Sequence, residues 1–87
     1  MSKWQLYIVE CNDGSLYTGI TTDLDKRIKR HNEGRATKYT RGRKPVRLAY
    51  SENLASESYA RRKEATIKRL SRKNKLEYIQ KNISLSS

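Results

Sequence analysis

The first 20 residues of the chain show the alternation of apolar and polar positions that is typical of β-strands. Residues 4–11 (WQLYIVEC) and 15–20 (SLYTGI) are rich in β-branched and aromatic types, so we predict two strands. The first strand has two apolar faces, made of Trp4, Leu6 and Ile8 on one side and of Tyr7, Val9 and Cys11 on the other. We therefore expect it to lie inside the sheet rather than at an edge.

The turn between these strands decides whether two tyrosines share a face, because loop length sets the pairing register. A two-residue loop would put Tyr17 on the face opposite to Tyr7. A three-residue loop would pair Tyr7 with Gly19 and make the two tyrosines diagonal neighbours on one face. Residues 12–14 (NDG) suit the successive positions of the longer loop, so we predict that register.

The pattern changes to a helical period after the second strand. Residues 22–34 carry a candidate N-cap at Thr22 or Asp23 and a stop at Gly34, which predicts one helix. A strongly basic segment over 35–47 follows and is expected to form a loop.

The C-terminal half is expected to add one strand and two helices. Residues 46–52 alternate again, and the side chains predicted on one face of this strand are Val46, Leu48 and Tyr50. Residues 56–70 and 71–83 have helical periods. The apolar stripe predicted for the last helix consists of Leu76, Ile79 and Ile83.

The predicted order ββαβαα indicates an α+β fold, in which a three-stranded, mostly antiparallel sheet is packed with helices. With 87 residues there is room for one core, so we expect a single domain over 1–83 and a disordered tail over 84–87. No apolar run approaches the roughly 20 residues of a membrane span, and no signal peptide is recognisable. One cysteine excludes an internal disulfide framework, and we expect a cytoplasmic monomer without a small-molecule cofactor.

The charge of the chain adds a functional expectation, because it favours polyanionic partners. The net charge is +11, from 20 basic and nine acidic residues, and residues 26–87 hold 19 of the basic ones. Nucleic acid is therefore the expected partner, ahead of an anionic membrane surface and of a surface that is charged only for solubility. The candidate nucleic-acid-binding residues are Arg35, Lys38, Tyr39, Arg41, Arg43, Lys44, Arg61, Arg62, Lys63, Lys68, Arg72 and Lys73.

Polar side chains occupy two notable positions on the predicted helices. Arg27 and His31 are four residues apart and share a helix face. His31, the only histidine, is either a partner of the helix C-terminus or part of a site. Glu64 falls on an inward stripe among five nearby cations. It is either an ordinary salt-bridge partner of Arg61 or Lys68, or a ligand of a divalent cation such as Mg²⁺.

Four short motifs along the chain form a recognisable set: QLYIV, YTG with its tyrosine ten positions after the first, DLDKRIKRHN and KEATIK. Together they resemble the GIY-YIG nuclease domain, and more closely its short stand-alone bacterial branch. The resemblance extends over about residues 4–80. Gln5 and Leu6 stand for the glycine and isoleucine of the family's first motif, and Thr18 stands for the isoleucine of the second. Several family members have a lysine three residues after the second tyrosine, where this chain has Ile20.

The resemblance implies a phosphodiester hydrolase that acts on DNA with one Mg²⁺ ion, and it implies a role for five residues. Tyr7 would be the general base that activates water through its phenolate, and Tyr17 would hold the water or a phosphate oxygen. Arg27 would stabilise charge on the scissile phosphate, and His31 would orient the base or the phosphate. Glu64 would be the only protein ligand of the metal.

Three functions remain open on this basis. The first is a Mg²⁺-dependent DNA endonuclease or DNA-structure-processing nuclease. The second is a non-catalytic basic nucleic-acid-binding module that retains the nuclease fold, and the third is an RNA- or ribosome-associated basic protein. All three predict salt-sensitive binding, so charge alone does not separate them.

Overall fold

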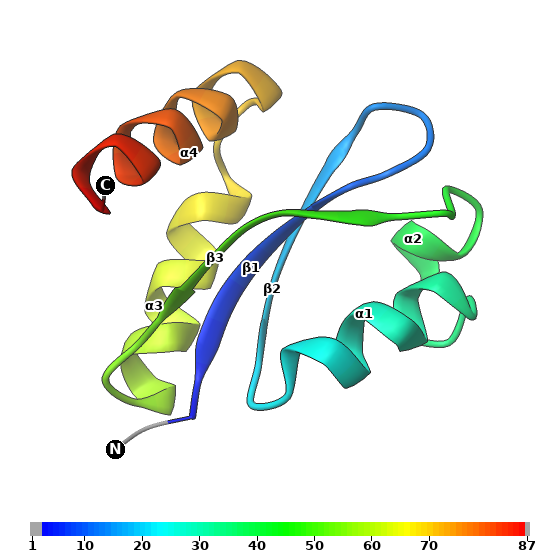
Figure 1. The fold of residues 1–87 in the computed structure, drawn as a ribbon, viewed down its shortest axis with the longest axis horizontal. Helices are drawn as coiled ribbons and strands as arrows, with labels where there is room; N and C mark the ends of the chain where they lie inside the picture. The colour runs from blue at the N-terminus through cyan, green and yellow to red at the C-terminus, as the bar shows by residue number, and fades with distance from the viewer. Residues whose placement is uncertain (1–2, 87) are drawn as a thin grey trace.

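The computed structural model describes residues 3–86 and shows a three-stranded antiparallel sheet with α1 and α2 on one side and α3 and α4 on the other (Figure 1). The strands are β1 (Gln5–Glu10), β2 (Leu16–Thr21) and β3 (Arg47–Asn53), in the order β2-β1-β3. The helices are α1 (Leu24–Asn32), α2 (Lys38–Arg41), α3 (Glu57–Lys68) and α4 (Arg72–Ser86). The predicted α+β class, the ββαβαα order and the central place of β1 are confirmed. The short helix α2 is an addition inside the segment expected to be a loop.

The boundaries of the single domain over 1–83 stay a prediction. The same holds for the tail over 84–87, because residue 87 lies outside the described residues and the side chains of 84–86 are not described. Within residues 3–86, no helix has both the length and the apolar character needed to cross a membrane.

The β1–β2 hairpin has the predicted three-residue loop. Tyr7 pairs with Gly19 and Val9 pairs with Tyr17. Gly14 closes the loop with a φ of +85°, a backbone conformation that residues with a Cβ atom rarely adopt. Tyr7 and Tyr17 therefore lie on the same face of the sheet.

The prediction that Val46, Leu48 and Tyr50 share one face is wrong. Two successive residues of β1 pair with Tyr50 and Leu48, so Ala49 is an extra residue in β3. This β-bulge reverses the side-chain alternation. Tyr50 packs on the α3 side of the sheet and Val46 packs on the α1 side, whereas Leu48 is 44% exposed.

Two clusters of apolar side chains join the helices to the sheet, one on each face. The cluster on the side of α3 and α4 contains Leu6, Ile8, Leu16, Leu54, Ala60, Ile67 and Ile79. The cluster on the side of α1 contains Tyr7, Val9, Cys11 and Val46, with Tyr17, Leu24 and Ile28 packed against it. The two apolar faces predicted for β1 are therefore confirmed, and both tyrosines of the candidate site belong to the second cluster.

Helix α4 buries a face that differs from the predicted stripe. Leu76 and Ile83 are 41% and 48% exposed, whereas Lys75 and Ile79 are buried. The Lys75 ammonium donates to the Leu16 carbonyl at 3.2 Å, so the aliphatic part of this side chain can cover the core while its charged end is hydrogen-bonded. Hydrophobic periodicity missed this face because a lysine occupies it.

Candidate active site

Tyr7 and His31 form a buried hydrogen bond between the sheet and α1. The Tyr7 hydroxyl lies 2.8 Å from Nε2 of His31, and the two residues are 1% and 0% exposed. Tyr7 comes from the central strand, and His31 comes from the last turn of α1. His31 thus belongs to an internal network, and it is not a solvent-exposed partner of the helix C-terminus.

Thr40 continues this network, although sequence reasoning did not include it in the site. Nδ1 of His31 lies 2.8 Å from Oγ1 of Thr40, which lies 3.0 Å from Oγ1 of Thr37. A protonated phenol at Tyr7 donates to Nε2, which places the imidazole hydrogen on Nδ1, where it donates to Thr40. Thr37 is the N-cap of α2, and Thr40 follows it by three residues. This spacing of two threonines was the signal in the sequence that could have pointed to Thr40.

Charged groups surround the Tyr7–His31 pair. Burial raises the pKa of Tyr7 to about 12; the charge of Arg27 opposes this rise, and Tyr17 and Glu64 add to it. Burial also lowers the pKa of His31, and the charge of Arg27 lowers it further. At neutral pH the pair is therefore a protonated phenol beside a neutral imidazole, within the electrostatic reach of the other three predicted site residues.

The lowered pKa of His31 predicts a loss of stability in acid. The unfolded chain takes up a proton at this histidine below about pH 6.5, whereas the folded protein resists protonation. Stability should therefore be unaffected by His31 above that pH and should fall as the pH is lowered below it, by at most about 1.4 kcal/mol per pH unit. Urea unfolding at several pH values checks this, and His31→Gln should remove this part of the pH dependence. An unchanged pH dependence in the variant contradicts the prediction.

The Tyr7 ring occupies the space that a side chain at position 19 would need, and this position is a glycine. A Cβ atom at Gly19 would lie 2.5 Å from the Tyr7 hydroxyl oxygen and 2.6 Å from its Cζ atom. The ring has little freedom to move away, because it is buried and its hydroxyl is bonded to His31. Glycine is therefore needed at this position for a close approach.

Gly19→Ala should destabilise the protein by about 1–3 kcal/mol, because the new methyl group overpacks the site and displaces the Tyr7 ring. Urea unfolding measures the change. Gly42→Ala is the matched control, since a Cβ atom there would meet nothing within 4 Å; its effect should stay within about 0.5 kcal/mol. Equal stabilities of the two variants would rule out the tight contact at Gly19.

Tyr17 contacts the same histidine from a less buried position. Its ring centroid lies 5.5 Å from that of His31 and 5.5 Å from that of Tyr39. Nζ of Lys68, from α3, lies 5.4 Å from the same centroid. Residues of α1, α2 and α3 therefore all lie close to Tyr17 on the edge strand β2.

Arg27 and Glu64 line one hollow of about 300 Å³, together with Ile20 and Arg61. The hollow lies beside the edge strand β2 and takes its walls from both α1 and α3. The Glu64 side chain is 22% exposed and forms an ion pair with Lys68 at 3.3 Å. A guanidinium and a carboxylate thus share a space that is open to solvent.

The lining of this hollow includes one acidic residue, which limits how a divalent cation could be held there. Among residues 3–86, no group of three or more His, Cys, Asp or Glu side chains is placed to hold a metal ion. Glu64 is the acidic residue of the hollow, and Mg²⁺ is commonly held by one or two carboxylates together with water and substrate phosphates. The residues therefore fit a weakly held Mg²⁺ ion that depends on substrate phosphate, and Lys68 would compete with it for Glu64.

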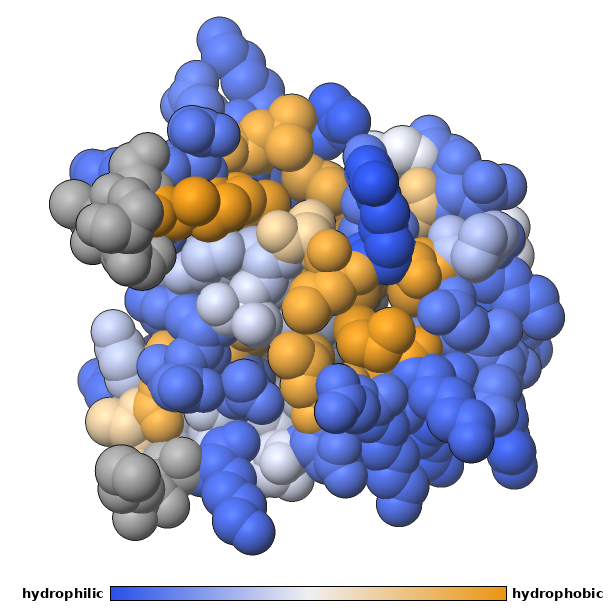
Figure 2. All heavy atoms as spheres, in the orientation of Figure 1, coloured by the Kyte–Doolittle hydropathy of each residue, from blue (hydrophilic) through white to orange (hydrophobic). Residues whose placement is uncertain are grey.

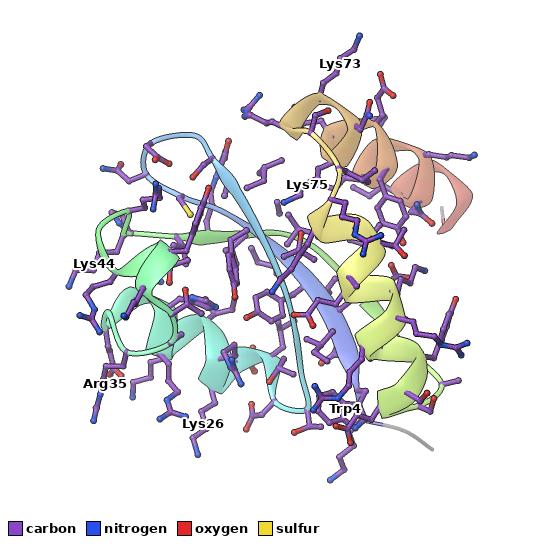
Figure 3. The ribbon with its side chains drawn as sticks, turned by 180° about the vertical axis from the view of Figure 1, so that it is seen from behind. Trp4, Lys26, Arg35, Lys44, Lys73 and Lys75 are labelled. Atoms are coloured by element: carbon purple, nitrogen blue, oxygen red, sulfur yellow. The ribbon has the colours of Figure 1, made fainter. Side chains whose placement is uncertain are left out.

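About half of the cations predicted to bind nucleic acid are paired with acidic residues of the chain. These ion pairs are Arg35 with Glu33, Arg43 with Asp13, Arg61 with Glu57, Lys63 with Glu52, Lys68 with Glu64 and Arg72 with Glu10. The predicted cations that form no ion pair within the described part of the chain are Lys38, Arg41, Lys44, Arg62 and Lys73. Figure 3 shows Lys44 and Lys73 pointing away from the protein on different sides.

Two of the predicted nucleic-acid-binding residues lie on a surface other than the candidate site. Arg62 and Lys63 line a separate, more apolar groove with Tyr59 on another side of α3. Tyr39 is 38% exposed and lies beside Tyr17, but the guanidinium of Arg43 already covers its ring at 4.1 Å. Stacking of a base on Tyr39 would have to displace that guanidinium.

Comparison with known proteins identifies the family of this chain. A family model described as the GIY-YIG catalytic domain matches residues 3–77. The chain belongs to the GIY-YIG family. A UPF0213 protein of Staphylococcus haemolyticus is 50% identical over 80 residues, covering 92% of this chain and 98% of that protein. A UPF0213 protein of Halobacterium salinarum is 51% identical over 70 residues, covering 80% and 91% of the two chains.

Solved structures support the same assignment. The solution NMR structure of a UPF0213 protein from Bacillus halodurans matches with a TM-score of 0.58 at 48% identity, over 88% of this chain and 82% of that one. The solution NMR structure of a protein from E. faecalis matches with a TM-score of 0.62 at 39% identity, with the same coverage. The predicted family and its short branch are thus confirmed, and this GIY-YIG chain has a nuclease-type fold.

Proposed function

We propose that this GIY-YIG protein is a Mg²⁺-dependent DNA endonuclease or DNA-structure-processing nuclease that hydrolyses a phosphodiester bond. The observation that carries the proposal is the buried Tyr7–His31 pair next to a hollow lined by Arg27 and Glu64. The nuclease-type fold and the net charge of +11 support a nucleic-acid substrate. The protein would act as a cytoplasmic monomer without a small-molecule cofactor.

Tyr7 can act as a base only after it loses its own proton, since a phenol with a pKa of about 12 is protonated at neutral pH. His31 is neutral and accepts a hydrogen bond from this phenol, so it orients the base, and the phenol proton is released to solvent as the substrate binds. The phenolate then removes a proton from a water molecule, whose oxygen attacks phosphorus. The bond from phosphorus to the leaving oxygen breaks, and that oxygen takes up a proton from solvent.

Positive charge is needed at two points of this reaction. Arg27 stabilises both the phenolate of Tyr7 and the charge that develops on the phosphate. A divalent cation bound by Glu64 and by the substrate would supply Lewis-acid stabilisation of the phosphate. Tyr17, which is less buried, would position the water or a phosphate oxygen.

A cleavage assay tests the proposal. The protein is incubated with nicked, branched, single-stranded and linear DNA and with single-stranded RNA, first with Mg²⁺ and then with EDTA. We expect at least one DNA substrate to be cut with Mg²⁺ and none with EDTA. If the protein cuts none of the nucleic acids in the panel, the nuclease proposal is wrong. If it cuts only RNA, the substrate is RNA rather than DNA.

The second candidate is a non-catalytic nucleic-acid-binding module. Two observations favour it: Glu64 is already ion-paired with Lys68, and Ile20 lines the hollow where several family members have a lysine. This candidate predicts salt-sensitive DNA binding without cleavage in the same assay.

A further inference from the structure

Three exposed cations without ion pairs lie on a helix that the predicted nucleic-acid surface leaves out. Lys26, Lys29 and Arg30 follow one another at helical spacing on α1 and share its solvent-exposed face. None of them forms an ion pair with an acidic group in the described range 3–86. Arg35 follows just beyond the end of the helix and is paired only loosely, at 3.9 Å from Glu33.

Adjoining hollows connect these cations to the candidate active site. The hollow that contains Glu64 shares Arg27 with a second hollow of about 330 Å³. The second hollow shares Lys26 and Arg30 with a third, of about 350 Å³, which ends at Arg35. Figure 3 shows Lys26 and Arg35 pointing outward from this side of the protein. A path lined mainly by cations, with Asp23 and Glu33 as its acidic residues, therefore leads from the site along α1.

We infer that this path, the α1 track (Lys26, Lys29, Arg30 and Arg35), binds the sugar–phosphate backbone of a nucleic-acid strand on one side of the scissile phosphate. The nine residues of α1 span about 14 Å, which matches about four nucleotides of a duplex strand at 3.4 Å each. The position of the scissile phosphate rests on the proposed nuclease function, whereas binding of the backbone does not.

The available charge favours the α1 track over most of the cations predicted to bind nucleic acid. A phosphate that binds Arg61 or Arg72 must compete with a carboxylate of the same chain. Lys26, Lys29 and Arg30 form no ion pair within residues 3–86, so each can neutralise a phosphate and release its counterion. The α1 track is therefore expected to contribute more affinity per cation.

The composition of α1 argues for nucleic acid and against a membrane surface as the ligand. A helix that lies in a membrane interface needs apolar side chains beside its cations. The apolar residues of α1, Leu24 and Ile28, pack against the sheet. Figure 2 shows a hydrophilic surface over α1 and α2, with the apolar region located elsewhere, across β3 and α4.

Binding measurements with two double variants of equal net charge test the α1 track. Lys26→Gln/Arg30→Gln removes two track cations, and Arg69→Gln/Lys81→Gln removes two exposed cations outside it. Fluorescence anisotropy is measured in EDTA with a labelled single strand and a labelled duplex of about 20 nucleotides, from about 50 to 200 mM salt. For the duplex, the track variant should lower the slope of log K against log salt by about 1.8 and weaken binding roughly tenfold or more, whereas the control should match the wild type.

The outcomes separate this inference from the proposed function. Equal affinities and slopes for the two variants overturn the α1 track, and so does a wild-type protein that binds neither oligonucleotide at low salt. A wild type that binds through the track but cuts no DNA overturns only the nuclease proposal. A wild type that cuts DNA while the two variants bind alike overturns only the track.

Discussion

Glu64→Gln is expected to abolish Mg²⁺-dependent cleavage while leaving DNA binding almost unchanged. Glutamine keeps the size of the side chain but removes the negative charge that a divalent cation needs from the protein. Loss of the ion removes several kcal/mol of transition-state stabilisation, which corresponds to a rate lower by about 10³-fold or more. Single-turnover cleavage rates and DNA affinities of wild type and variant measure the two effects separately.

Glu57→Gln is the matched control for this variant. Glu57 lies on the same helix and forms an ion pair with Arg61, as Glu64 does with Lys68, but it does not line the hollow. Ion pairs of this exposed kind contribute only about 0.3–0.5 kcal/mol, so both variants should remain folded. If Glu64→Gln cuts DNA in Mg²⁺ as fast as the control, Glu64 is not the metal ligand.

Tyr7→Phe should lower the cleavage rate by about 10²- to 10⁴-fold, because it removes the oxygen proposed to accept the proton of water. Phenylalanine keeps the ring that packs over Gly19. It leaves Nε2 of His31 without its partner, which should destabilise the protein by about 1–3 kcal/mol. Cleavage must therefore be measured below the unfolding transition, and DNA affinity should stay close to that of the wild type.

Tyr59→Phe serves as the control for Tyr7→Phe. Tyr59 is 41% exposed and lines the separate groove beside α3, so loss of its hydroxyl should change neither cleavage nor stability. A folded Tyr7→Phe protein that cuts DNA at the rate of this control would show that another group activates the water.

Much of the geometry of the candidate site could be predicted because loop length and helical spacing relate residues that are close in the sequence. The three-residue turn alone placed Tyr7 and Tyr17 on one face, since the register of a hairpin follows from its loop. Helical spacing placed Arg27 and His31 together, and it put Glu64 on the side of α3 that faces the sheet edge. Each of these inferences needed only residues within one or two neighbouring elements.

Features that depend on contacts between distant elements were not predictable in this way. The bulge at Ala49 arises from the pairing of β3 with β1. Lys75 is buried because its ammonium donates a hydrogen bond to the carbonyl of Leu16, which is far away in the sequence. Thr40 belongs to the site only because α2 brings its hydroxyl within hydrogen-bond distance of Nδ1 of His31. The charges of the sequence predicted a basic protein, but only the folded structure determined which cations are paired with acids and which are free to bind phosphate. Ion pairing depends on distances that the chain acquires when it folds.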